Sequence, residues 1–198
     1  MPLTVVDGPA EEPVSLDEVA NHLRIATDDV DDTTLSQYIS AVRRNLEEVG
    51  GFALVTQTLE WSQDYFPVWT RQNPHAAIRL PRPPLQSVTS ITYIDSTGSP
   101  LVMDPADYTV DTRPVPGQVF PAYGLVWPSA RWTPNSVIVR YVAGYAGVGA
   151  VPEDYRQMVL VAAGELFEYR EAMVDGGAPQ STGVLTRLMG PRRVWVTA

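Results

Sequence analysis

Residues 32–51 read DTTLSQYISAVRRNLEEVGG, and this stretch is the clearest structural signal in the chain. Its apolar positions are separated by four, three, four and three residues, which is the spacing of one face of an α-helix. Gly50-Gly51 offers the left-handed residue at which such a helix ends. The stretch therefore predicts an amphipathic helix with one buried stripe, formed by Leu35, Ile39, Val42, Leu46 and Val49.

Two further helices are predicted outward from this one. Upstream, Ser15 and Glu18 have the spacing of a capping box, and Leu16, Val19 and Leu23 then fall on one face. Downstream, Pro152 is a residue favoured in the first turn of a helix, and two acidic residues follow it. The apolar stripe of this third helix is Tyr155, Val159, Ala162, Leu166 and Tyr169.

The region between the second and third helices has a different character. Short runs rich in β-branched and aromatic residues alternate there with proline and glycine. The sequence DSTG at 95–98 is typical of a hairpin turn before Leu101-Val102. The strands we expect are residues 57–65, 77–80, 88–95, 108–111, 125–127 and 136–142.

The expected fold class is α+β, with a bundle of three main helices, an inserted small antiparallel β domain and an extended C-terminal tail. Residues 1–55 are assigned to the N-terminal part of the bundle, 56–143 to the β domain and 144–175 to the third bundle helix. Residues 176–198 are assigned to a flexible linker and a tail. The tail is apolar and basic, reads VLTRLMGPRRVWV at 184–196, and is too short to fold alone.

Composition excludes several classes of function. The 198 residues include no cysteine, which rules out disulfides, thiolate catalysis, Fe–S clusters and zinc sites that need sulfur. All 14 basic residues are arginines, and 23 acidic residues bring the net charge to −9. A general nucleic-acid binder or a protein of anionic membrane surfaces needs the opposite balance. We therefore expect neither role.

Targeting signals are not expected either. The N-terminus lacks the basic region of a signal peptide, and no apolar run approaches the roughly 18–20 residues that span a bilayer. The sequence thus predicts a protein of the cytoplasm, or of a particle assembled there.

Three motifs could suggest metal or nucleotide binding, but a structural role explains each of them better. Residues 28–32, DDVDD, lack the glycine and glutamate positions of an EF-hand and are typical of an acidic capping loop. Glu165, Glu168 and Glu171 share the third helix with no histidine that would complete a carboxylate metal site. Residues 144–149, GYAGVG, do not open a helix as a dinucleotide-binding loop would.

The remaining candidates are single residue types. His22 has no partnering nucleophile motif, so it is not expected to be a general base. Five tryptophans have few cations near them in the sequence, which favours core and interface packing over base stacking. We expect no enzyme, no cofactor and no metal, but a structural or binding protein.

The order of several short motifs resembles the head–tail connector (adaptor) family of long-tailed bacteriophages and related gene transfer particles. The resemblance covers nearly the whole chain and is specific as an ordered set. The motifs are PVSLDEVANHLRI at 13–25, YISAVR at 38–43, LVTQT at 54–58, LPRPPLQSV at 80–88, ITY at 91–93, VAGY at 142–145, VP at 151–152 and YRE at 169–171.

This resemblance implies a structural ring, typically of twelve copies, in the neck of a virion or phage-like particle. Such a ring joins the portal protein to a stopper or tail-completion protein, and DNA passes through its channel without specific binding. We expect the helices to form the ring body through Leu35, Ile39, Val42, Leu46, Tyr155, Val159 and Leu166. The residues expected to dock the tail on the portal are Leu185, Arg187, Leu188, Arg192, Arg193 and Trp195.

Two alternatives stay open. The chain could be another neck component, a stopper or a tail terminator, although these are expected to be mainly β. It could also be a small accessory enzyme whose site is built between subunits, in which case the pure protein would bind a ligand.

Overall fold

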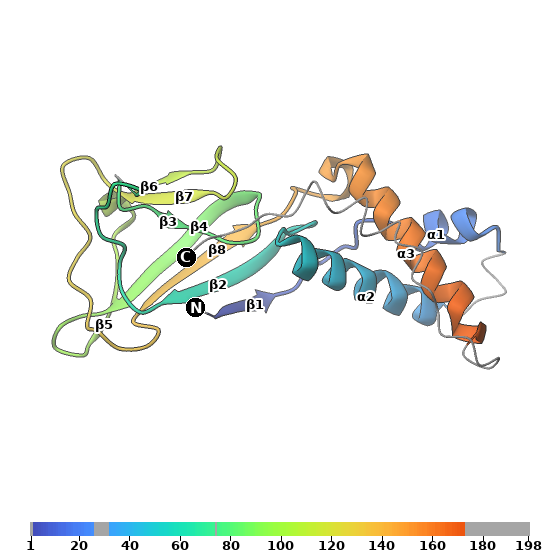
Figure 1. Cartoon of the computed structure of the whole chain (residues 1–198), viewed down its shortest axis with the longest axis horizontal. Coiled ribbons are helices and arrows are strands. Elements are labelled where there is room, and N and C mark those ends of the chain that lie inside the picture. Colours follow the sequence, from blue (N-terminus) through green and yellow to red (C-terminus); the bar gives the residue numbers. More distant parts are fainter. Residues whose placement is uncertain (1, 26–31, 74, 173–198) are drawn as a thin grey trace. The chain divides into compact units, whose positions relative to one another are not determined.

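The computed structural model describes residues 2–25, 32–73 and 75–172, which form an α+β structure (Figure 1). These residues divide into two compact units, a helical unit from 11–55 and 145–172 and a sheet unit from 2–10 and 56–144. The helices and strands are β1 (Leu3–Asp7), α1 (Leu16–Leu23), α2 (Asp32–Gly50), β2 (Gln57–Gln63), β3 (Ile78–Arg79), β4 (Leu85–Ile94), β5 (Pro100–Val102), β6 (Tyr108–Asp111), β7 (Gln118–Pro121), β8 (Val137–Ala143) and α3 (Glu153–Ala172).

The helical unit is built around the predicted stripe of α2. Its core lies among α1, α2 and α3, with α3 packing against both other helices. Four of the five predicted α2 positions are buried, whereas Val49 is 38% exposed. Gly51 has the positive φ of a helix terminator, as the sequence indicates. The buried α2 positions are Leu35, Ile39, Val42 and Leu46.

The capping box predicted at the start of α1 is confirmed. The Glu18 backbone N–H donates to the Ser15 hydroxyl at 3.2 Å, and the Ser15 N–H donates to the Glu18 carboxylate at 2.8 Å. Glu18 also accepts from Arg156 of α3, so one carboxylate joins the cap of α1 to a second helix. The backbone N–H of Ser15, with help from Arg156, lowers the pKa of Glu18.

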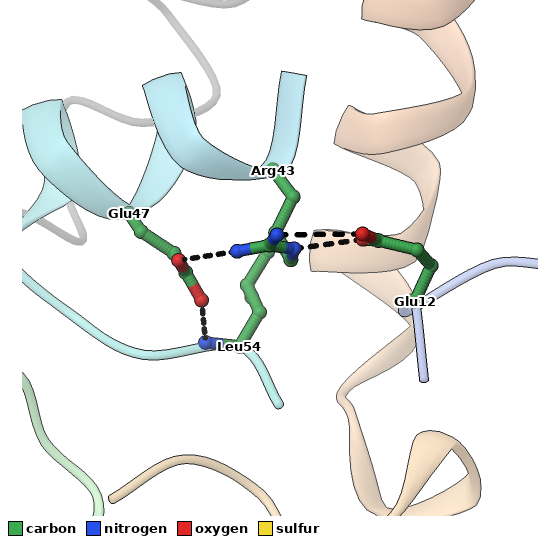
Figure 2. A network of polar contacts seen from close by, with 4 residues as sticks. All are labelled: Glu12, Arg43, Glu47 and Leu54. Carbon is green, nitrogen blue, oxygen red and sulfur yellow. Dashed lines mark hydrogen bonds and ion pairs between the residues drawn. The ribbon is translucent and has the colours of Figure 1, made fainter. Parts of the chain in front are cut away.

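A buried ionic network joins α2 to the segments on either side of it (Figure 2). Arg43 donates to Glu12 at 2.7 Å and to Glu47 at 3.0 Å, and Glu47 accepts from the Leu54 backbone N–H at 2.8 Å. The side chains of Arg43 and Glu47 are only 5% and 1% exposed. Burial opposes the charge on Arg43, but the two carboxylates outweigh it and raise the pKa of Arg43. This network fixes the segment that leaves α2.

The sheet unit contains a five-stranded antiparallel sheet in the order β1-β2-β8-β4-β5. A second sheet has the order β3-β7-β6 and is also antiparallel. The central strand β8 buries alternate residues, as the period of a strand requires. One of these is Tyr141, whose hydroxyl donates to the Pro81 carbonyl at 2.7 Å and whose pKa is raised by burial. The core residues of β8 are Val137, Val139, Tyr141 and Ala143.

The α+β class is confirmed, but the emphasis on a helical bundle is not. The described residues form eight strands against three α-helices, so the β part is not a small insertion. Residues 1–55 were assigned to the helices, yet β1 pairs with β2 and lies in the sheet unit. The strand predicted at 125–127 is wrong, because these residues form a loop, and β7 takes its place in the second sheet.

Candidate interaction surface

The two units differ strongly in charge. Residues 11–55 and 145–172 carry fifteen acidic residues against five arginines. Residues 1–10 and 56–144 carry seven acidic residues against six arginines and are therefore close to neutral. The acidic excess of the chain, whose net charge is −9, thus comes from the helical unit, whose own net charge is −10.

Exposed apolar side chains are distributed in the opposite way. Among the described residues, the helical unit exposes the large hydrophobic side chains of Val49 and Leu166, and the sheet unit exposes all the others. Exposed apolar residues gathered on one part of a protein are typical of a surface that contacts another protein. The exposed set of the sheet unit is Val5, Val6, Tyr65, Val68, Trp69, Leu101, Val102, Val115, Tyr123, Leu125, Val126 and Trp132.

Seven of these residues lie in two loops, 64–76 and 122–135, which we call the aromatic loops. They are Tyr65, Val68, Trp69, Tyr123, Leu125, Val126 and Trp132. Trp69 and Trp132 are 71% and 83% exposed, which is unusual for the residue type that gains most from burial. Aromatic residues of this kind form the energetic centres of many protein interfaces.

The first aromatic loop is fastened by Asn73. Its side-chain oxygen accepts from the Ala77 backbone N–H at 2.9 Å, and its amide nitrogen donates to the Ala77 carbonyl at 3.0 Å. Its own backbone N–H donates to the Thr70 hydroxyl at 3.0 Å. These bonds form a compact turn directly after Val68 and Trp69, so the two exposed side chains stand on a fixed backbone.

A buried contact joins the two aromatic loops. Phe66 is buried and stacks on Trp127 with ring centroids 4.9 Å apart, and Tyr93 of β4 lies against the edge of the same phenyl ring at 5.6 Å. The Trp127 indole N–H donates to the Ala76 carbonyl at 2.6 Å. Trp127 therefore uses its ring and its polar atom within the unit, whereas the other two tryptophans of these loops, Trp69 and Trp132, are exposed together with Tyr65 and Tyr123.

Polar contacts hold the bases of both loops to the sheet. The Asn135 N–H donates to the Asp64 carboxylate at 2.9 Å, and the Ser136 hydroxyl donates to the Asp64 carbonyl at 2.6 Å. The Arg131 N–H donates to the Ile94 carbonyl at 2.8 Å. An exposed surface that is already ordered loses little conformational entropy when a partner binds, which favours affinity.

A shallow hollow lies beside the second aromatic loop. It is lined by His75, Phe120 and the turn from Pro121 to Leu125, and the His75 ring contacts the edge of Phe120 at 5.8 Å. The turn depends on Gly124, whose φ of 80° is unfavourable for other residues. In the described part of the chain no cluster of acidic and histidine side chains could hold a metal ion. Because Phe120, Pro121, Ala122 and Leu125 make most of the lining apolar, the hollow fits an apolar side chain of a partner.

The residues predicted as ring contacts lie mainly inside their own unit. Leu35, Ile39, Val42, Leu46 and Val159 are buried in the helical core, where they hold the helices to one another. Tyr155 is half-buried and packs against Phe52, with ring centroids 4.7 Å apart. Leu166 is 42% exposed. Of the seven, Leu166 thus has the most surface to offer to another chain.

The residues predicted to dock on the portal fall outside the described residues. This applies to Leu185, Arg187, Leu188, Arg192, Arg193 and Trp195, whose role stays a prediction. The aromatic loops were missed as a surface. The only signal in the sequence was the density of tryptophan, tyrosine and proline between 65 and 132, and residue type alone does not separate exposed from buried aromatic residues. No described helix is long and apolar enough to cross a membrane.

No protein-family model matches the sequence, and no curated protein matches it. Solved structures do match over the full chain. A chain from the virion of a native gene transfer agent particle has a TM-score of 0.76 at 21% identity. Chains from the neck of the empty particle, computed with C6 symmetry, and of the native particle, computed with C12 symmetry, have TM-scores of 0.78 and 0.74 at 20% identity. Each match covers 100% of this chain and 98% of the other. The chain therefore shares its whole fold with these particle components.

Proposed function

We propose that this chain is a structural component of the neck of a phage-like particle of the gene transfer agent type. The observation that carries the proposal is the fold match over 100% of this chain and 98% of chains from such necks. The exposed aromatic loops support a protein that works through contacts with other proteins. The buried polar groups of the helical unit serve the fold, as the Glu12, Arg43 and Glu47 network illustrates.

Within the neck, we propose the role of head–tail connector (adaptor). Copies of the chain form a ring, with twelve as the expected number, and the ring joins the portal protein to the stopper or tail-completion protein. A neck structure computed with C12 symmetry is among the matches, which supports a ring of this size. Because the helical core residues are already buried, ring contacts through the helices have to use exposed positions such as Leu166.

The charge division suggests how the two units share this role. A DNA channel works best when its wall does not retain the phosphate backbone, and the helical unit carries the acidic excess. We place the helical unit in the ring body along the channel and the aromatic loops against the next protein of the neck. Replacing exposed Asp17 and Glu48 with arginine should then slow DNA release from the particle. Unchanged release would contradict this placement.

The direct experiment measures binding to capsids that carry the portal but lack tails. The pure protein and the capsids are mixed and sedimented, and the number of bound copies per capsid is counted. The connector role predicts saturable binding near one ring per capsid. Deletion of residues 184–198 is expected to leave a folded chain that no longer binds, because the tail is proposed to dock on the portal. Absence of binding by the full chain would refute the adaptor role.

The large share of strands keeps a second neck role in consideration. Stoppers and tail terminators are expected to be mainly β, and the three predicted helices argued against these roles. The eight strands in the described residues weaken that argument. The same assay separates these roles when it is repeated with free tails. A tail terminator binds tails and not portal-bearing capsids, whereas the connector binds the capsids first.

A further inference from the structure

Among the described residues, the first strand of the large sheet is an edge strand. Within that part of the chain β1 pairs with β2 on one side only, and of its five residues Thr4, Val5, Val6 and Asp7 are exposed. Proteins normally protect a free sheet edge with proline, lysine, a short strand or a covering segment. The opposite edge is protected in this way, because β5 has three residues and begins with Pro100. β1 contains no proline or lysine and ends in a bulge between Val5 and Asp7.

The alternation of the ladder shows which backbone groups of β1 are free to pair. The Ser62 N–H donates to the Pro2 carbonyl at 3.1 Å, so Pro2 faces β2. Thr4, paired with Glu60, faces β2 as well, since every second residue of a strand points to the same side. The N–H and C=O groups of Leu3 and Val5 therefore point away from the sheet. Two donors and two acceptors are presented at the spacing that an added strand requires.

One segment of the same chain has the chemistry to occupy this edge. Residues 192–197 read RRVWVT, in which β-branched residues and a tryptophan follow two arginines. Gly190-Pro191 separates them from the rest of the tail. Residues 173–191 connect α3 to this segment and can extend over about 60 Å. A segment tethered to its own site binds at a high effective concentration, which favours it over a free partner.

Charge selects the direction of pairing. Asp7 lies at the end of β1, and only an antiparallel strand brings the two arginines of RRVWVT to that end. The bulge between Val5 and Asp7 breaks the alternation there, so the register is defined along Leu3–Val5, where Trp195 lies opposite Val5 and Thr197 opposite Leu3, with the arginines near Asp7. An aromatic residue facing a β-branched residue is a favourable cross-strand pair. In this register Trp195 would also cover part of the apolar surface that Val5 and Val6 expose.

We propose that residues 192–197 add to β1 of their own chain as a sixth, antiparallel strand of the large sheet. This pairing does not depend on the proposed role in a neck. It narrows the part of the tail that is free for the portal to Leu185, Arg187 and Leu188.

Hydrogen exchange of the full chain tests the proposal at single amides. The Leu3 and Val5 amides should exchange at least about tenfold more slowly than in a variant lacking residues 192–198. The Thr4 amide, which points to β2, is the internal control and should be protected in both proteins. If the Leu3 and Val5 amides exchange equally fast with and without the segment, the proposal is overturned.

A designed disulfide tests the register and the source of the strand. The chain has no cysteine, so the variant Thr4→Cys with Val196→Cys contains a single possible pair. The proposed register predicts a bond within one chain under mild oxidation. Thr4→Cys with Trp195→Cys is the matched control and should not close, because a shift of one residue moves the side chain to the other face. A bond between two chains, or equal closure in both variants, would overturn the proposal.

Discussion

The helical unit and the sheet unit differ in their charge and in how much apolar surface they expose. The helical unit is acidic outside, buries its apolar residues and contains a buried ionic network. The sheet unit is almost neutral and leaves a dozen large apolar side chains exposed, seven of them on loops that are fastened by hydrogen bonds and ring contacts. The helical unit thus places most of its apolar side chains in its own core, whereas the sheet unit keeps an ordered apolar surface exposed, which is the basis for proposing that it contacts another protein.

The largest effect is expected from breaking the network of the helical unit. Arg43→Met leaves the Glu47 carboxylate buried without its cation, which should lower the free energy of unfolding by about 3–5 kcal/mol. Urea unfolding followed by circular dichroism reports the helices. Tryptophan fluorescence reports the sheet unit, because the four described tryptophans all lie there. Arg44→Met, at the exposed neighbouring position, is the control and should stay within about 0.5 kcal/mol. Equal shifts of both signals would show that the two units unfold as one.

The second effect concerns binding. Trp69→Ala and Trp132→Ala should each weaken binding to a neck partner by about 1–2 kcal/mol, which is roughly five- to thirtyfold in affinity. Stability should change little, because both side chains are mostly exposed. Sedimentation with portal-bearing capsids, and then with the next neck protein, identifies the partner that is lost. Val102→Ala removes an exposed apolar side chain of the sheet unit outside the aromatic loops and should leave this contact intact. Full binding by both tryptophan variants would contradict the proposal that the aromatic loops of the sheet unit contact another protein.

A smaller effect is expected at the start of α1. Ser15→Ala removes the hydroxyl that accepts from the Glu18 N–H and should cost about 1 kcal/mol of stability. Thermal unfolding followed by circular dichroism measures this loss. Ser36→Ala, at an exposed position within α2, is the matched control and should be neutral or slightly stabilising, because alanine has the higher helix propensity. Equal behaviour of the two variants would mean that the cap does not limit the stability of the unit.

The smallest effect is a dependence on acid. The pKa of Glu18 is lowered in the folded chain by the Ser15 backbone N–H and by Arg156. The carboxylate therefore contributes stability above its ordinary pKa, and this contribution is lost as the pH falls through the lowered value. Glu18→Gln should flatten the fall in unfolding midpoint between neutral pH and the acid range. Ser15→Ala keeps the backbone N–H and should retain most of that fall. Parallel pH profiles for wild type and Glu18→Gln would exclude this contribution.

Sequence patterns were sufficient to predict those elements whose formation depends on residues close together in the chain. The stripe of α2, the Ser15 capping box and the strand at 108–111 were predicted with nearly the observed bounds, because each depends on neighbouring residues. β1 was missed because its partner β2 lies some fifty residues further along the chain. Residues 125–127 have the composition of a strand, but the Trp127 indole bonds to the Ala76 carbonyl and the segment stays a loop.

The sequence predicted that the protein would have an interaction surface, but not which residues form it. The sequence led us to expect a structural or binding protein, and its tryptophans favoured packing or interfaces over base stacking. The sequence did not show that Phe66 and Trp127 would stack on each other, or that Trp69 and Trp132 would be exposed to solvent. That outcome depends on the contact between two loops about sixty residues apart, which no local pattern encodes.

The place where the chain leaves and re-enters the helical unit has a consequence for how such a protein can evolve. Val55 and Tyr145 form a β-bridge, so the two ends of the segment between them lie side by side. An insertion between adjacent points costs little loop-closure entropy whatever its length. The sheet unit could thus be exchanged for another module that recognises a different partner while the helices stay unchanged. β1 limits this freedom, because the N-terminal strand must find a matching edge in whatever module replaces the sheet.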